Sequence, residues 1–535
     1  MARALAAAIV ASLLAVSGAG GAGAQTPKRG GTVVIPMSTN LGFSPPCLNP
    51  YVPACRMPGA ELVFASAYDR NPDSTLRPGL ARVEFTTKPP FTLTYRIRPE
   101  ARWSDGVPIT ARDFIYTHEM TRALFPDSDH ATRIRSVAQI DRKTLRAVLR
   151  GKFAGWRYLF SFVLPRHALA GVDLTKVWTD RIDNPKTGEP IGSGPFLVSS
   201  YERGRQITFV RNKRYWGPHP AYLDRLVSRV VPYSTVDEAI AAFRRGEFDA
   251  WLSLPPQHVR EIRREEPRLK VVWNYGTSWE YLAIRRGDGG HPALRRKHVR
   301  RALAYGIDRV EIQRDWGAAI DPAFQPSDSA VFLNQSPYYR PNWSTYRYRP
   351  AAVGRLLRQA GCNRGADGIY SCDGQRLSLR FVADAGNLRR AAWFELIQAD
   401  LRRVGVELTP VFATPGAVRQ ILKDGTYDLA LTNEFYTPDS LGLTDYFSCE
   451  ARFNVTGYCQ RLVTRDLDQA DRILDSDQRA RVLNRADRQM AKDVPVIPLW
   501  TGPRTAAHKT TLRGLVLTTV GGTLHLGAEN WWLER

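Results

Sequence analysis

Long apolar runs are absent from this chain after its first two dozen residues, and histidine is scarce. No later segment of the 535 residues is long and apolar enough to cross a membrane. The nine histidines are scattered, and His118-Glu119 is followed by Met-Thr-Arg, which does not complete a His-Glu-x-x-His zinc motif. These absences argue against an integral membrane protein and against a metalloprotease of that type.

Phosphate-binding and hydrolase motifs are missing as well. The stretch IGSGPFLVSSY, residues 191–201, has two glycines around Ser193, but Leu197 stands where a dinucleotide-binding loop needs its third glycine. The alternating residues that follow predict a strand, whereas a P-loop or a nucleophile elbow leads into a helix. We therefore interpret Ser193 as part of a strand entry in which Gly192 and Gly194 give the turn its freedom. Since no acidic pair has a suggestive spacing either, the sequence predicts no catalytic residue and no enzyme.

The first 24 residues have the features of a secretory signal peptide. Arg3 precedes an apolar core from Ala4 to Val16, and Ala22-Gly23-Ala24 forms a small-residue cleavage site before Gln25. No cysteine follows this segment directly, so we expect no lipid anchor. The mature chain is then expected to be soluble and secreted into the periplasm or the cell-envelope space.

The six cysteines fall into three close pairs, which suits an exported protein. Fifteen connectivities are possible, and the economical one joins neighbours in three small loops, each stabilising by about 2–3 kcal/mol. No pair has the two-to-four-residue separation of zinc ligands, so no metal and no cofactor are expected. The predicted disulfides are Cys47–Cys55, Cys362–Cys372 and Cys449–Cys459.

Basic residues outnumber acidic ones, 75 to 52, giving a formal net charge of +23. The arginines are spread along the whole chain and do not gather in a tail or a recognition helix, so no nucleic-acid partner is expected. A preference for anionic ligands or an anionic surface remains the alternative.

Strand and helix patterns alternate along the chain, which predicts an α/β protein of two or three domains. Residues 91–97 alternate as a half-buried strand, and Thr110 is placed to cap a following helix. A second region from Ser378 repeats strand, helix and strand up to a turn at Asp424-Gly425. Two such lobes predict a ligand cleft between them.

Several long motifs, in this order, resemble the extracellular solute-binding proteins of family 5, which serve peptide- and nickel-type ABC importers. A departure from the family pattern is AIRRGD, where an asparagine usually follows the aromatic. The motifs cover essentially residues 30–535 and are FTLTYRIRPEARWSDGVPITARDFIYT, IGSGPFLVSSYERGRQITFVRNKRYWG, YLAIRRGDGGHPALRRKHVRRALAYGIDRVEI and MAKDVPVIPLW.

The resemblance implies a periplasmic-binding-protein-like α/β fold (type II, cluster C) with two lobes around a cleft and an inserted extra domain. A discontinuous first lobe would hold residues 25–55, 190–272 and 500–535, with the inserted domain at 56–189. The third part, 273–499, would close over the ligand by bending near Trp273 and Trp500.

The implied function is the exported substrate-binding component of an ABC importer. Such a protein binds a small solute, here expected to be a peptide, and delivers it to the transmembrane subunits of the permease. We expect a monomer. A nickel chelate, an oligosaccharide or another peptide-like metabolite would suit the same fold, and an exported hydrolase is the distant alternative.

One carboxylate is singled out by the resemblance. In peptide-binding members an aspartate four residues before a proline pairs with the ligand's α-amino group, and Glu434 holds that place before Pro438. Glutamate is one methylene longer than the family's aspartate, and Asp439 is the second candidate. The alternative is a solvent-facing glutamate at the end of a strand.

Four aromatic residues complete the predicted binding site. Tyr275, Trp279 and Tyr281 open the third part, and Trp500 lies where the chain returns to the first lobe. Their rings could stack on the ligand or pack in the core, since alternation fits both. Trp103 and Trp216 belong to turn motifs and are expected to have structural roles.

Overall fold

The computed structural model describes residues 26–38, 47–52, 55, 57–231, 236–317, 320–321, 324–437, 440–519 and 525–534. The predicted signal peptide and Asp439 lie outside the described residues.

The N-terminal part of the molecule contains a four-stranded sheet of order β1-β10-β9-β8. Its strands are β1 (Thr32–Ser38), β8 (Phe196–Glu202), β9 (Gln206–Arg211) and β10 (Arg225–Val231). β1 runs parallel to β10, and the other pairs are antiparallel. The predicted strand after IGSG is therefore confirmed as β8.

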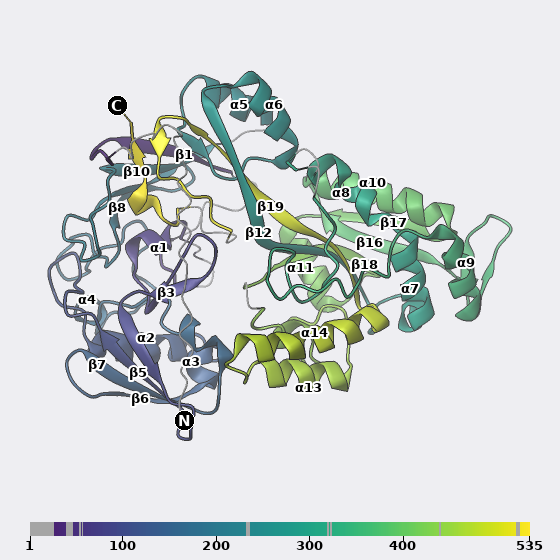
Figure 1. The fold of residues 1–535 in the computed structure, drawn as a ribbon, viewed down its shortest axis with the longest axis horizontal. Coiled ribbons are helices and arrows are strands. Elements are labelled where there is room, and N and C mark those ends of the chain that lie inside the picture. The colour runs from purple at the N-terminus through teal and green to yellow at the C-terminus, as the bar shows by residue number, and fades with distance from the viewer. Residues whose placement is uncertain are drawn as a thin grey trace, which may run out of the picture.

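A second four-stranded sheet, of order β4-β5-β7-β6, lies beside the first (Figure 1). The predicted strand is β5, with Leu93, Tyr95 and Ile97 buried. Thr110 caps α2 as expected, because its backbone N–H donates to Asp113 at 2.8 Å in a capping box. The elements here are α1 (Ala60–Val63), β2 (Tyr68–Arg70), β3 (Leu76–Pro78), β4 (Ala81–Phe85), β5 (Thr92–Ile97), α2 (Ala111–Leu124), α3 (Asp129–Thr132), β6 (Ile134–Gln139), β7 (Thr144–Leu149) and α4 (Arg166–Leu169).

The rest of the chain builds a six-stranded mixed sheet of order β11-β19-β12-β18-β16-β17. The predicted strand–helix succession from Ser378 is confirmed as β16 (Ser378–Asp384), α10 (Leu388–Arg403), β17 (Glu407–Ala413), α11 (Pro415–Asp424) and β18 (Leu429–Phe435). Further elements are α5 (Val236–Arg244), β11 (Ala250–Trp251), α6 (Val259–Glu265), β12 (Leu269–Ile284), α7 (Lys297–Gly306), α8 (Arg309–Gly317), α9 (Pro350–Gln359), β13 (Cys362–Arg364), β14 (Tyr370–Cys372), β15 (Gln375–Arg376), α12 (Thr444–Phe447), α13 (Arg461–Ala470), α14 (Ser476–Asp493), β19 (Val496–Lys509), β20 (Leu512–Arg513) and β21 (Trp532–Leu533).

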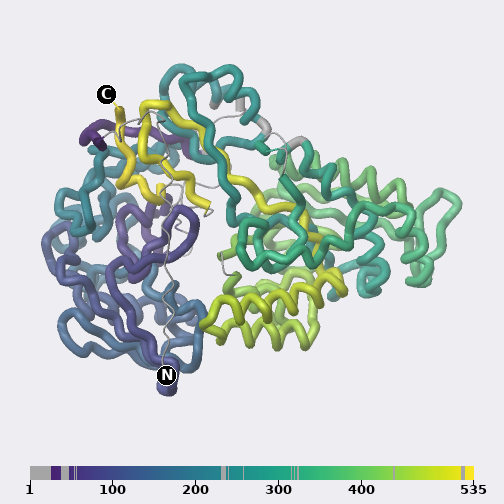
Figure 2. The backbone as a smooth tube through the Cα atoms, in the orientation of Figure 1, coloured from purple at the N-terminus to yellow at the C-terminus, as the bar shows by residue number. Residues whose placement is uncertain are grey.

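Two long antiparallel strands, β12 and β19, join the N-terminal part to the six-stranded sheet (Figure 1). Their register shifts between Tyr275 and Trp279 and again after Glu280. One hydrophobic core gathers buried residues between 279 and 500, and another joins residues 33–252 to the C-terminal segment 506–531. The tube of Figure 2 shows this yellow C-terminal segment returning to the N-terminal part. The boundaries of the three-part division stay a prediction.

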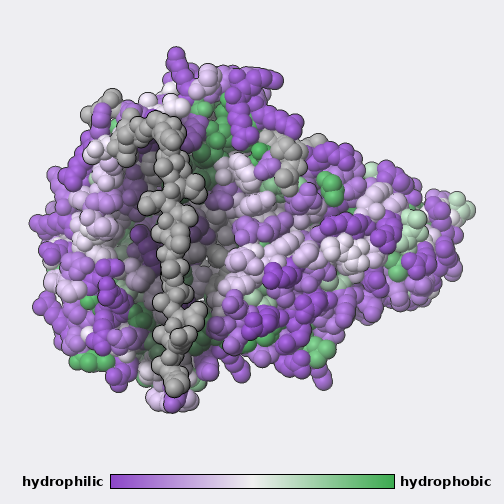
Figure 3. Space-filling model, viewed as in Figure 1, coloured by the Kyte–Doolittle hydropathy of each residue, from purple (hydrophilic) through white to green (hydrophobic). Residues whose placement is uncertain are grey.

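All three predicted disulfides are present: Cys47–Cys55, Cys362–Cys372 and Cys449–Cys459. Cys362 and Cys372 are directly opposite each other in the β13–β14 pair. Much of the surface in Figure 3 is hydrophilic, and none of the described helices combines the length and the hydropathy that crossing a membrane requires.

The glycines of IGSG have a different role from the predicted one. Neither Gly192 nor Gly194 has a positive φ, so turn freedom is not why glycine is needed. A Cβ on Gly192 would lie 2.8 Å from the carbonyl oxygen of Val63, and one on Gly194 would overlap the Leu62 carbonyl. Ser193 Oγ accepts the Ala65 N–H at 2.9 Å. The motif therefore lets α1 pack closely against the entry to β8.

Candidate functional site

The candidate site lies at the carboxyl ends of β16 and β18. These two strands are parallel neighbours, and β16 is followed directly by the N-terminus of α10. In α/β folds ligands bind outside the carboxyl ends of parallel strands, where side chains from successive loops converge. Glu434 stands at this end of β18, opposite Trp279 of β12.

Glu434 shares its face of the sheet with a stack of aromatic rings. The ring centroid of Trp279 is 4.2 Å from that of Tyr281 and 5.2 Å from that of Tyr436, both in stacked geometry. Trp279 has no exposed surface and Tyr281 is 3% exposed. The two predicted aromatics therefore form the packed wall behind Glu434 and do not present free rings.

Burial raises the pKa of Glu434 to about 7, although hydrogen bonds from Tyr446 and Tyr281 act in the opposite direction. No arginine, lysine or histidine of the described chain forms an ion pair with this carboxylate. A half-buried carboxylate without a cation is destabilised in its charged form, and a ligand ammonium group would supply the missing charge.

The opposite face carries a second charged group, centred on Glu280. Its carboxylate is buried and pairs with Arg389 and Arg390, the first arginines of α10. Burial alone would raise the pKa of Glu280, but the two guanidinium groups outweigh it and hold the pKa below its usual value. Arg390 also binds Asp384 and donates to Asn433 Oδ1 at 2.7 Å.

The other two predicted aromatics lie on this opposite face. Trp500 is paired with Glu280 across the β12–β19 ladder and is 2% exposed. The Phe324 ring lies between Trp500 and Tyr275, with centroids at 5.1 and 5.5 Å. The Arg389 guanidinium lies 5.6 Å from the Trp500 ring centroid and 4.5 Å from that of Trp393. The structure thus separates the predicted residues into two groups on the two faces of one sheet.

Several buried polar atoms around this edge have no hydrogen-bond partner within the described chain. Buried polar groups are nearly always satisfied, so such a concentration points to a bound molecule or water as the missing partner. These atoms are Trp279 Nε1, Arg389 Nη1 and Trp393 Nε1.

Sequence reasoning missed Glu280, Arg389, Arg390 and Phe435. Phe435 ends β18 and is 61% exposed, which is unusual for a large aromatic side chain. A signal was available for the arginines, because they follow the N-cap Asn387 directly after a predicted strand. No signal in the sequence pairs them with Glu280, which is more than a hundred residues away.

An α/β sheet joined to a second part by two long strands is the architecture of solute-binding proteins of the periplasmic type. Residues 75–453 match the model of the bacterial extracellular solute-binding proteins, family 5 (middle), and the chain belongs to this family. The predicted family and fold class are confirmed.

Relatives and solved structures agree with this assignment. The oligopeptide-binding protein OppA of Mycobacterium tuberculosis is 27% identical over 449 residues, which cover 80% of this chain and 72% of that protein. A periplasmic EDTA-binding protein, EppA, matches with a TM-score of 0.81 and 23% identity over 96% of this chain and 98% of its own. The oligopeptide-binding protein AppA of Bacillus subtilis, solved with a nonapeptide, matches with a TM-score of 0.77 and 19% identity over 95% and 100%.

Proposed function

We propose that this chain is the exported binding component of an ABC importer and that its ligand is a peptide with a free α-amino group. The proposal rests on the environment of Glu434. This carboxylate is half-buried at the carboxyl edge of the sheet and has no cationic partner in the described chain. OppA and AppA, both named oligopeptide-binding proteins, support the ligand class.

The chemistry of binding follows from the charges. A peptide ammonium brought next to Glu434 forms a charge-assisted hydrogen bond, which is about twice as strong as a neutral one. Binding should lower the pKa of Glu434 and release a proton at pH near 7, since burial holds the pKa of the free carboxyl at about 7. Phe435, exposed at the end of the same strand, belongs to the opposite face of the sheet and is not part of this contact.

Calorimetric titration with trialanine and N-acetyl-trialanine tests the proposal. The wild type should bind trialanine and lose affinity by about 10–100-fold for the acetylated peptide, which has no ammonium group. Glu434→Gln should lose affinity for trialanine by a similar factor. Glu395→Gln, an exposed glutamate of α10, is the matched control and should bind as the wild type does.

Equal affinity for the free and acetylated peptides in the wild type would contradict the proposal. Binding of a metal chelate such as nickel–EDTA would then favour the alternative suggested by the EDTA-binding neighbour. Steady turnover of a peptide or ester, abolished by one substitution, would favour the exported hydrolase. Closure of the third part over the ligand, docking on the permease and a monomeric state belong to the same proposal.

A further inference from the structure

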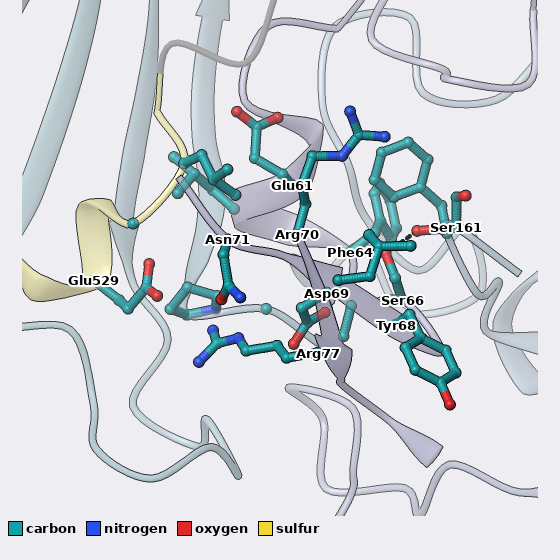
Figure 4. Close-up of a pocket in the computed structure, with 18 of the residues that line it drawn as sticks. Glu61, Phe64, Ser66, Tyr68, Asp69, Arg70, Asn71, Arg77, Ser161 and Glu529 are labelled. Carbon is teal, nitrogen blue, oxygen red and sulfur yellow. Dashed lines mark hydrogen bonds between the residues drawn. The ribbon is translucent and has the colours of Figure 1, made fainter. Parts of the chain in front are cut away.

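A cavity of about 380 Å³ with charged and apolar walls lies in the N-terminal part of the molecule, and no residue of the site described above lines it. Its walls come from α1, the β2–β3 hairpin, residues 157–162, the β8 entry at Gly194 and Pro195, and the C-terminal turn 526–530 (Figure 4). Segments from both ends of the chain meet here, together with Tyr215 of the RNKRYWG motif.

Charges of both signs line this cavity without pairing. Its wall holds three acidic residues and three arginines, and no ion pair within 4.0 Å joins any of these acids to any of these arginines in the described chain. Elsewhere arginines find carboxylates readily, as Arg376 does with Asp367 and Glu407. The six residues are Glu61, Asp69, Glu529, Arg70, Arg77 and Arg157.

Two of the acidic side chains, Glu61 and Asp69, are partly removed from water. Burial raises the pKa of Glu61 to about 7, and the Glu529 carboxylate adds to the rise. Burial likewise raises the pKa of Asp69 to about 6, again with a contribution from Glu529, although Arg77 acts in the opposite direction. Glu61 Oε1 lies 4.0 Å from His525 Nδ1, and neither atom has a hydrogen-bond partner in the described chain.

Five of these six charged side chains are labelled in Figure 4. The Glu61 and Arg70 side chains extend along one side of the cavity, and Asp69, Arg77 and Glu529 lie along another. Arg70 is also placed over the Tyr158 ring, 5.6 Å from its centroid. No ion pair joins these carboxylates to these guanidinium groups in the described chain, so a ligand with both charges could bind among them.

The size of the cavity limits the ligand. A cavity of about 380 Å³ lies at the lower end of the range of small-molecule sites and accommodates an amino acid or a dipeptide. An ammonium group would bind Glu529 or Asp69, and a carboxylate group would bind Arg77, whose fork of donors suits it. We propose that this cavity is a second binding site for a small zwitterion, a free amino acid or a dipeptide, independent of the site at Glu434.

Calorimetric titration with glycylglycine, in a chain carrying Glu434→Gln to weaken the first site, tests the proposal. One binding event should remain in this background. Adding Arg77→Gln or Glu529→Gln should weaken that event at least tenfold, whereas Arg82→Gln, an exposed arginine of β4 outside the cavity, should leave it unchanged. Arg77 is exposed and Glu529 half-buried, so both variants should keep the wild-type circular dichroism and Tm.

Two single-charge probes complete the experiment. Glycinamide, which lacks the carboxylate, and N-acetylglycine, which lacks the ammonium, should each bind at least tenfold more weakly than glycylglycine. Absence of binding in the Glu434→Gln background, or binding that neither cavity variant changes, would overturn the proposal. Equal affinity for glycinamide and glycylglycine would also overturn the proposal, because the cavity would then bind a cation without using the ligand's carboxylate. The first site is tested by a different measurement, the binding of trialanine by the wild type. Failure of one proposal can therefore be distinguished from failure of the other.

Discussion

Gly194 shows how much a single position can depend on the absence of a side chain. Its backbone N–H donates to Val63 O at 2.9 Å, and its carbonyl accepts from Asn212 Nδ2 at 2.8 Å. Trp216 Nε1 donates to the neighbouring Ser193 carbonyl at 2.9 Å. The two motifs IGSGPF and RNKRYWG are thus bonded to each other and to the end of α1, and the expected structural role of Trp216 is explained.

Replacing Gly194 by alanine should destabilise the fold. The new Cβ would overlap the Leu62 carbonyl, and such overpacking costs about 1–3 kcal/mol in the free energy of unfolding. Gly151→Ala is the matched control, because its φ is not positive and no heavy atom lies within 4 Å of its built Cβ. Urea unfolding of both variants checks the prediction, and equal midpoints would contradict it.

The sequence could predict only part of the candidate site at the residue scale. Glu434 was predicted because the resemblance to family 5 implies a carboxylate four residues before a proline, here Pro438. Alternation could not decide whether Trp279 faces a ligand or the core, since both faces of this central sheet are covered. The Glu280–Arg389 pair depends on the β12–β18–β16 order, which local sequence does not encode.

At the scale of elements, α2 and α3 are joined by a buried histidine pair. His118 Nδ1 lies 3.3 Å from His130 Nδ1, and His130 Nε2 accepts the Phe160 N–H at 3.4 Å. His130 must therefore carry its proton on Nδ1 and donate it to His118. Burial lowers the pKa of His130 to about 3, with His118 adding to the effect, and burial together with Arg122 lowers the pKa of His118.

This pair makes the stability of the N-terminal part sensitive to acid. The pKa of His130 in the folded chain lies below its value of about 6.5 in the unfolded chain, so the unfolded state binds the proton first as pH falls. The free energy of unfolding should decrease by up to about 1.4 kcal/mol per pH unit from pH 6.5 toward pH 3.

Urea unfolding at pH 7, 6 and 5 measures this slope. His130→Gln should reduce this slope, because close to one proton fewer is taken up on unfolding. His219→Gln, at a position outside the pair, should leave the slope as in the wild type. A slope that His130→Gln does not change would refute the prediction.

At the scale of the whole molecule, the second sheet region and the third part touch at several points. The Ala154 N–H donates to Asp471 O at 2.8 Å, and Arg133 lies 3.8 Å from the Asp471 carboxylate. Arg452 pairs with Asp127 at 3.4 Å. Figure 1 shows α3 beside α13 at this junction. The local patterns predicted the strands and helices of both parts, but these contacts join residues some 300 positions apart and could not be predicted from them.

An acidic cluster at this junction should make the contact between the two parts depend on pH. Burial raises the pKa of Asp129 and of Asp471, and the Asp445 carboxylate adds to both. A pKa that is raised only while the parts are in contact means that the contacting form binds more protons than the separated form. Acidification should therefore favour contact, and ionisation of Asp129 and Asp471 as pH rises should oppose it.

Small-angle scattering without ligand at pH 5.5 and 7.5 tests this dependence. The wild type should have the smaller radius of gyration at pH 5.5. Asp445→Asn removes one of the repelling charges, so it should be compact already at pH 7.5 and change less between the two pH values. Asp468→Asn, an exposed aspartate of α13 outside the cluster, should behave as the wild type does. If all three proteins had the same radius of gyration at both pH values, the acidic cluster would not contribute to the contact between the two parts. The contacts of Ala154 and Arg452 would then account for this junction by themselves.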